Sequence, residues 1–205
     1  MINDHLPLQL RPRTLRELEY AGFVAREVNL NAATGRPSRL GRYRICDNYT
    51  RFYLHFIEPN RAAISNGLFK YSSMEQMKGW DVQLGYQFEN LVANHVCDLF
   101  RHLGIERSLV LSAAPYVQRG TKRGEGCQID LLVQTRRTVY VVEIKRRREI
   151  GSGIMDEVAE KVKRLKVAAG VFVRTALVYD GRLSPRIEAE HGFDVLVPAN
   201  RLLQV

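Results

Sequence analysis

A chain of 205 residues has room for one ordinary domain, or for a small module followed by a modest domain. Its 45% apolar residues can form a core, and its net charge of +9 favours a polyanionic partner such as nucleic acid; the alternative is a soluble protein that is merely basic. Three scattered cysteines fit neither a disulfide scaffold nor a zinc site, and no apolar stretch can span a bilayer, so we expect a cytoplasmic protein with no membrane association.

The first predicted module covers residues 1–59 and consists of short elements. In chain order we expect a helix, two strands around a turn and a second helix, at residues 14–21, 23–30, 39–45 and 48–57. Gly22 ends the first helix, and Asp47 can cap the second. A helix followed by a two-stranded wing is the back half of a winged helix-turn-helix, so we predict a partial winged helix. Residues 60–80 are expected to be a linking region with weak helical character.

The second predicted module covers residues 81–205 and alternates helices with strands. We expect helices at 85–103, 156–166 and 184–191, and strands at 108–117, in a hairpin at 128–145, at 170–179 and at 193–197. Apolar residues recur at helical spacing in 85–103, whereas 170–179 is almost continuously apolar, as in a buried strand. This order of elements predicts an α/β fold.

The hairpin carries the most informative residues of the chain. Strand side chains alternate between faces, so Glu143 and Lys145 share one face of the second arm. A turn near 135–138 makes Asp130 a neighbour of Glu143. Two carboxylates this close repel one another unless a cation lies between them, and hard cations such as Mg²⁺ prefer oxygen ligands. The alternative is an ordinary strand whose charged end faces solvent.

These residues, together with Glu89 on the preceding helix and the helix that follows, resemble the PD-(D/E)XK nuclease superfamily. The resemblance implies a restriction-endonuclease-like core, with a mixed sheet flanked by helices. It assigns Mg²⁺ or Mn²⁺ to Asp130, Glu143 and Glu89, and we expect the Ile144 carbonyl to be a further ligand. Lys145 then assists the attacking water, so all four charged residues belong to the implied catalytic site.

Two details of the resemblance concern neighbouring residues. Ile129 precedes Asp130, where the family pattern names proline, and this departure is frequent in the superfamily. Many relatives also carry a polar residue on the helix after the lysine. Glu157 or Lys161 is the candidate for that position in this chain.

A narrower resemblance covers nearly the whole chain. Its residues are Tyr43-Arg44-Ile45, Asp47, Arg51-Phe52, Phe56, Pro59, Gly85 and Phe88-Glu89, followed by the strands of Asp130 and Glu143. They are similar to the C-terminal region of archaeal-type AAA+ ATPases, in which an ATPase precedes a winged helix and a nuclease-like domain of unclear function. The chain has no G-x-x-x-x-G-K-[ST] sequence and is not itself the ATPase. We therefore expect it to lack an upstream ATPase or to act with a separate one.

Basic residues flank the open end of the hairpin. Those proposed to bind DNA are Arg119, Lys122 and Arg123 before the first arm, Arg146, Arg147 and Arg148 after Glu143, and Arg36 and Arg39 in the wing. Nearby glycines predict flexible loops at both flanks of the hairpin. Phosphate contacts of this kind give salt-sensitive and largely sequence-independent binding. The alternative is a solvated run of charge, and a first module that only packs against the second.

Three functional hypotheses follow from the sequence. The leading one is a metal-dependent DNA-processing enzyme that hydrolyses phosphodiester bonds. The second is a non-catalytic DNA-binding or regulatory module of an ATPase. The third is a protein-interaction domain whose missing winged-helix half comes from a partner or from a second copy in a homo-oligomer.

Overall fold

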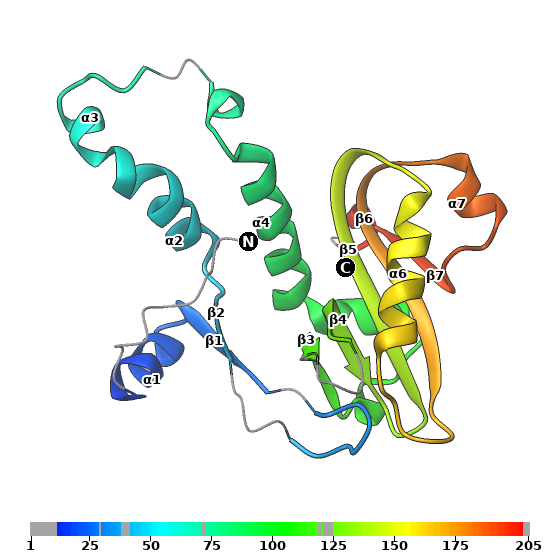
Figure 1. Ribbon diagram of the computed structural model, residues 1–205. Helices are drawn as coiled ribbons and strands as arrows, with labels where there is room; N and C mark the ends of the chain where they lie inside the picture. Colours follow the sequence, from blue (N-terminus) through cyan, green and yellow to red (C-terminus); the bar gives the residue numbers. More distant parts are fainter. Residues whose placement is uncertain are drawn as a thin grey trace. The chain divides into compact units, whose positions relative to one another are not determined.

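The computed structural model describes residues 12–28, 30–37, 42–70, 73–118, 120 and 125–202 (Figure 1). The chain divides into two compact units. The first contains Met1–Glu27 and Arg42–Asn90, and the second contains Val28–Gly41 and Leu91–Val205. This division differs from the boundaries at residues 59 and 80 expected from the sequence. No helix in the described ranges has the length and apolar character needed to cross a membrane.

The first unit opens with a helix and a small antiparallel sheet. The elements are α1 (Pro12–Tyr20), β1 (Val24–Glu27) and β2 (Arg42–Ile45), with Val24 paired to Ile45. The predicted order of helix and two strands is confirmed. The strand expected at 23–30 is shorter, however, because a turn begins at Asn31. The Asn31 side chain accepts hydrogen bonds from the Ala33 and Thr34 amides, both at 3.0 Å.

A continuous helical run follows the small sheet. It consists of α2 (Asn48–Phe52), a π-helix η1 (Tyr53–Ile57), a 3-10 turn η2 (Glu58–Asn60) and α3 (Arg61–Ser65). Asp47 accepts a hydrogen bond from the Thr50 amide at 2.6 Å, which confirms the predicted N-cap. The helix was expected to end at residue 57. Its extension into the predicted linking region shows that Pro59 is accommodated in a first-turn position of a short 3-10 helix.

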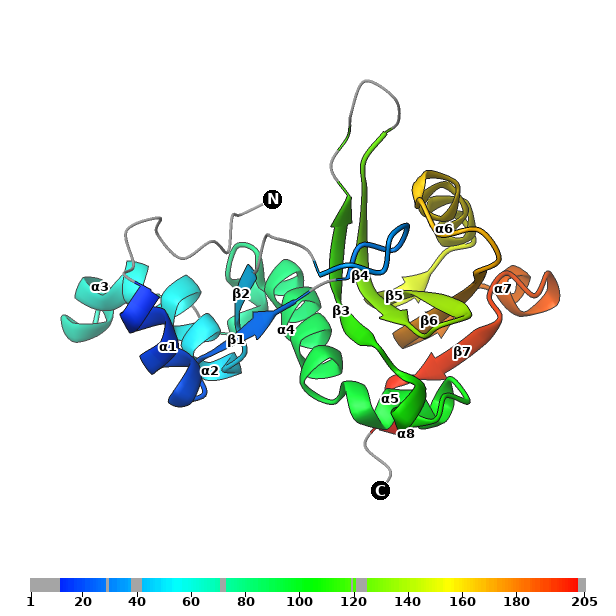
Figure 2. The ribbon, with the colours of Figure 1, turned by 90° about the horizontal axis from the view of Figure 1, so that it is seen from below.

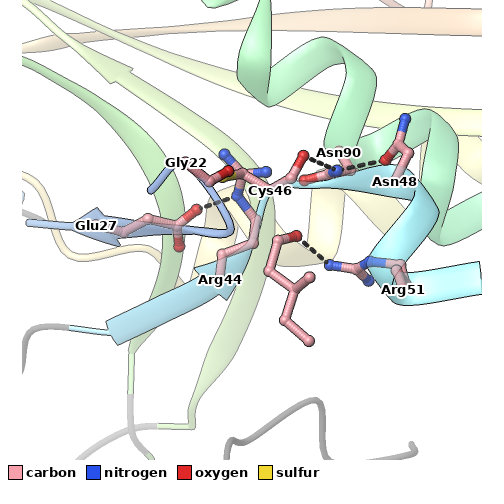
Figure 3. Close-up of polar contacts among 8 residues, drawn as sticks. Gly22, Glu27, Arg44, Cys46, Asn48, Arg51 and Asn90 are labelled. Atoms are coloured by element: carbon pink, nitrogen blue, oxygen red, sulfur yellow. Dashed lines mark hydrogen bonds and ion pairs between the residues drawn. The ribbon is translucent and has the colours of Figure 1, made fainter. Parts of the chain in front are cut away.

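Buried polar contacts hold the first unit together (Figure 3). The Arg51 guanidinium is buried and donates to the Ile45 carbonyl at 3.0 Å. Asn90 donates to the Cys46 carbonyl at 2.9 Å, and Arg44 pairs with Glu27 at 2.6 Å. The first two bonds tie the helical run and helix α4 (Trp80–Asn94) to backbone carbonyls at the end of β2, and the third joins β2 to β1.

The long helix expected at 85–103 is two helices. Helix α4 begins earlier, at Trp80, and α5 (Val96–His102) follows a break at His95, whose φ of −108° and ψ of 28° leave the helical region. Hydrophobic periodicity does not reveal the break, because apolar residues recur on both sides of it. A further short 3-10 turn, η3 (Met74–Gln76), lies before α4.

The second unit is built on a five-stranded mixed sheet (Figure 2). The strands are β3 (Ser112–Gln118), β4 (Cys127–Gln134), β5 (Thr138–Ile150), β6 (Phe172–Leu183) and β7 (Val195–Pro198), in that spatial order. The β3–β4 and β4–β5 pairs are antiparallel, and the β5–β6 and β6–β7 pairs are parallel. Helices α6 (Gly153–Arg164), α7 (Pro185–Ala189) and α8 (Ala199–Leu202) and the turn η4 (Arg107–Leu109) complete the unit. The predicted α/β class is confirmed.

One core of the second unit lies between the sheet and α6. Leu132, Val141 and Leu177 from the strands pack with Ile154 and Val158 from the helix. The apolar stripe of α6 explains this packing, since all of its charged residues except Lys161 are exposed. Helix α6 is therefore held directly over the hairpin arms that carry Asp130 and Glu143.

Strand β5 continues well beyond Lys145, contrary to the expected loop. Between Arg146 and Glu149 the β5–β6 register shifts: Arg146 pairs with Asp180 and Glu149 with Arg182, so two residues of β5 lie opposite one residue of β6. Arg147 and Arg148 thus lie in a β-bulge. Pairing with β6 on both sides of the bulge keeps this arginine run in the sheet.

Replacing Gly181 with alanine is expected to destabilise the second unit by on the order of 3 kcal/mol or more. Gly181 has a φ of +138°, and a Cβ there would lie 1.7 Å from the Arg147 carbonyl oxygen. Urea unfolding measures the effect. Gly151→Ala is the control, because a Cβ at that position meets nothing within 4 Å. Equal stability of the two variants would contradict the close approach of β6 to the bulge.

Candidate carboxylate–lysine site

Asp130 lies at an irregularity in strand β4. Ala114 pairs with Leu132 and Tyr116 with Ile129, so one residue of β3 lies opposite two residues of β4, Asp130 and Leu131. The β4–β5 ladder ends at the neighbouring Leu131. Such a bulge redirects a side chain and ends regular pairing, and bulges are frequent beside functional sites.

The Asp130 side chain takes the place of a missing backbone partner. Its Oδ2 accepts a hydrogen bond from the Ile144 amide at 2.9 Å. The Thr135 amide donates to the Thr138 carbonyl at 2.9 Å at the other end of the hairpin, as the predicted turn requires. The two arms are therefore locked at both ends, with Asp130 beside the β5 segment that contains Glu143.

Glu143 is a buried carboxylate held by two lysines. Its side chain is 3% exposed, and the Lys161 ammonium on α6 donates to Oε2. The Lys145 Nζ lies 3.5 Å from Oε1 and 4.0 Å from the Glu157 carboxylate. The two lysines are 22% and 24% exposed, so their ion pairs with Glu143 are partly shielded from water. A charge at this depth is tolerated only when it is paired.

The pKa of Asp130 is raised in this cluster. Burial, and next the charge of Glu143, raise the pKa of Asp130 from its ordinary value of 3.8 to about 6, although Lys161, the Ile144 amide and Lys145 oppose the rise. Burial disfavours the charged form of Lys161, but the charges of Glu143 and Asp130 outweigh it and raise the pKa of Lys161. The cluster thus contains a carboxyl group that exchanges its proton near neutral pH.

The donor set is suited to a hard divalent cation. Mg²⁺ is commonly bound by one or two carboxylates, with waters and substrate phosphates as the other ligands, and Asp130 and Glu143 meet that description. In the described ranges, no group of three or more His, Cys, Asp or Glu side chains is arranged to hold a metal ion. The Lys161 ammonium already neutralises one oxygen of Glu143, so a metal ion would compete with it.

The predicted site residues are only partly collected in this cluster. Asp130, Glu143 and Lys145 are brought together, and the Ile144 amide bonds directly to Asp130. Glu89 lies half-buried on α4 in the first unit, and its metal role stays a prediction. The catalytic and metal roles of the other residues stay predictions as well.

The basic residues that we proposed to bind DNA differ in where the structure places them. Arg119, Lys122, Arg123 and Arg39 lie outside the described residues. Arg36 is exposed beside the Asn31 turn. Arg146, Arg147 and Arg148 lie in strand β5, so the flexible loop expected for them is wrong; Arg146 pairs with Asp180 at 3.3 Å, and the other two are exposed. The parallel ladder with β6 accounts for the difference.

Lys161 is the site residue that the sequence identified least clearly. It shared a weak candidacy with Glu157, four residues earlier on the same helix. In the structure Lys161 forms an ion pair with Glu143, whereas Glu157 lies 4.0 Å from Lys145. The usable signal was the position of Lys161 between Val158 and Val162, which points α6 toward the sheet, but residue spacing alone does not rank two polar neighbours.

Comparisons with known proteins give distant similarities. No protein-family model matches the chain. An uncharacterised protein of Methanocaldococcus jannaschii, MJECL04, is 26% identical over 136 residues, which are 64% of this chain and 28% of that protein. The solved structure of protein VC1899 from Vibrio cholerae covers 73% of this chain and 41% of its own, with 14% identity and a TM-score of 0.43. The chain thus spans well under half the length of either protein, and neither similarity assigns it to a family.

Proposed function

We propose that this protein is a metal-dependent DNA-processing phosphodiesterase with a PD-(D/E)XK nuclease-like core and a partial winged helix before it. One observation carries the proposal: Asp130, at a bulge of β4, feels the charge of the buried Glu143, and Lys145 lies 3.5 Å from Glu143. A buried carboxyl group whose pKa is raised beside a second carboxylate and a lysine is typical of sites that do chemistry.

In the proposed reaction Asp130 and Glu143 hold Mg²⁺ or Mn²⁺, with the Ile144 carbonyl and Glu89 as further predicted ligands. When bound, such an ion polarises a phosphate and lowers the pKa of a coordinated water. Lys145 orients the attacking water or stabilises negative charge on the phosphate. Lys161 holds the Glu143 carboxylate in place from α6.

The proposed DNA contacts follow strand β5. Arg147 and Arg148 are exposed a short distance beyond Lys145 on the same strand. Guanidinium groups there can bind phosphates of a backbone that reaches the carboxylates. The proposed association with an AAA+ ATPase, upstream or separate, rests on the sequence resemblance.

A second candidate is a non-catalytic DNA-binding or regulatory module. It is favoured by the two ammonium groups that already face Glu143, since a closed ion network holds a fold together without a metal ion. In that case DNA binding is salt-sensitive, independent of divalent metal and indifferent to Glu143→Gln.

Cleavage of plasmid and single-stranded DNA in Mg²⁺ or Mn²⁺ is the direct test. Under the enzyme proposal Asp130→Ala and Glu143→Gln each lower the cleavage rate by on the order of 100-fold or more. Glu149→Gln is the matched control, because Glu149 is exposed on the same strand. Cleavage that survives in Asp130→Ala would refute the proposal. Tight metal-independent binding without cleavage would favour the second candidate.

A further inference from the structure

A recess lies at the end of the hairpin opposite the two carboxylates. Its volume is about 590 Å³, and its walls include Ile105, Leu109, Leu111, Arg136, Arg137 and Tyr140. The two arginines belong to the turn between β4 and β5. Tyr140 and Glu143 are an odd number of residues apart on β5, so their side chains leave opposite faces of the sheet. The recess is therefore separate from the carboxylate–lysine site.

The positive charge at this recess is uncompensated. Arg136 and Arg137 are exposed, and within the described part of the chain neither makes an ion pair. Arg174 lies 5.9 Å from the centre of the Tyr140 ring and is paired with Asp194 at 3.5 Å. Two adjacent free guanidinium groups offer the planar donors that bind phosphate oxygens in pairs.

The remaining wall is apolar. Leu109 is 57% exposed and Leu111 is 52% exposed, although both are large hydrophobic side chains. Tyr140 and Ile105 also line the recess and are themselves buried. Apolar and aromatic walls with a few convergent polar groups are characteristic of small-molecule sites, and the volume is in the range of such sites.

We infer that this recess binds a small phosphorylated ligand with a planar apolar body, of the nucleotide class. Arg136 and Arg137 hold the phosphate, and the base lies against Leu109 and Tyr140 in the wall of the recess. Two guanidinium groups favour a phosphate over an uncharged ligand, and the leucines favour a ligand larger than a bare anion. The inference does not depend on metal binding or on catalysis at Asp130 and Glu143.

Titration calorimetry of the full chain with AMP, in EDTA, tests the assignment. We expect saturable binding that Arg136→Gln combined with Arg137→Gln weakens at least tenfold, and that Leu109→Gln weakens by a smaller factor. Arg101→Gln is the matched control, an exposed arginine on α5 outside the recess, and leaves the affinity unchanged. Glu143→Gln also binds AMP normally, which separates this result from the nuclease proposal.

Competition experiments identify the ligand class. We expect inorganic phosphate and decanoate each to bind the recess at least tenfold more weakly than AMP, as measured by their ability to displace bound AMP. Absence of saturable AMP binding, or equal affinity in the double arginine variant, would overturn the assignment. If inorganic phosphate competes as well as AMP, the recess is only an anion site. If decanoate competes more strongly than AMP, the ligand is a carboxylate amphiphile. Either result refutes the nucleotide class.

Discussion

Replacing Lys161 with methionine is expected to lower the free energy of unfolding by about 3 kcal/mol in EDTA. The variant keeps the apolar stem but removes the ammonium that bonds to Glu143. The Glu143 side chain is 3% exposed in the native protein, and Lys145, at 3.5 Å, is the ion-pair partner that the variant keeps. The value is at the lower end for a broken buried pair because Lys161 is 24% exposed and partly screened by water. Urea unfolding at neutral pH measures the difference.

The same variant reports on metal binding without an activity assay. If the carboxylates hold a divalent ion, removal of the competing ammonium strengthens that binding, so Mn²⁺ raises the stability of Lys161→Met more than that of the native protein. Lys163→Met is the control, since Lys163 is exposed and pairs with Glu160. If Lys161→Met is as stable as the native chain, the ion network is energetically unimportant. If Mn²⁺ stabilises neither protein, the metal proposal fails.

Replacing Asp130 with asparagine is expected to stabilise the metal-free protein at pH 8 by up to about 3 kcal/mol. Burial and Glu143 raise the pKa of Asp130 to about 6, so the folded state favours the protonated acid. This group's stabilising contribution is complete below pH 3.8 and is lost as the pH rises through 6. Asparagine carries no charge and keeps an oxygen that can accept the Ile144 amide proton.

The pH profile is the decisive measurement for Asp130→Asn. Urea unfolding in EDTA at pH 8, 6 and 4 should show a stability gain that shrinks toward zero at the lowest pH. Asp180→Asn, an exposed carboxylate on β6, should change stability by less than about 1 kcal/mol throughout. A constant difference across the pH range would contradict the raised pKa. A gain at pH 8 combined with loss of metal binding would show that the carboxylate is retained at a cost in stability.

Local patterns were sufficient to predict the hairpin and its neighbours. Alternating apolar residues on two arms around residues 135–138 specify a register in which Asp130 and Glu143 approach each other, because a one-residue slip would expose the core face. The apolar stripe of α6 and the nearly continuous apolar run of β6 similarly determined their element types. Long periodic segments are strongly specified because their burial dominates local preference.

The sequence patterns failed where two distant segments decide the backbone. The break at His95 and the extension of β5 to Ile150 depend on what each segment packs or pairs with. The bulge at Asp130 depends on β3, which contributes one residue fewer to the ladder. Strict alternation along a single strand contains no record of such mismatches.

By itself the sequence determined that the chain is α/β, that it is basic, and that Asp130, Glu143 and Lys145 share one end of a hairpin. Tertiary structure alone decided that Lys161 reaches Glu143 from α6 and that Asp130 lies at a bulge of β4. It also brought the arginines of the hairpin turn beside the apolar recess at Leu109. Periodicity specifies which residues share a face, whereas the partner of each side chain depends on the packing of segments far apart in the chain.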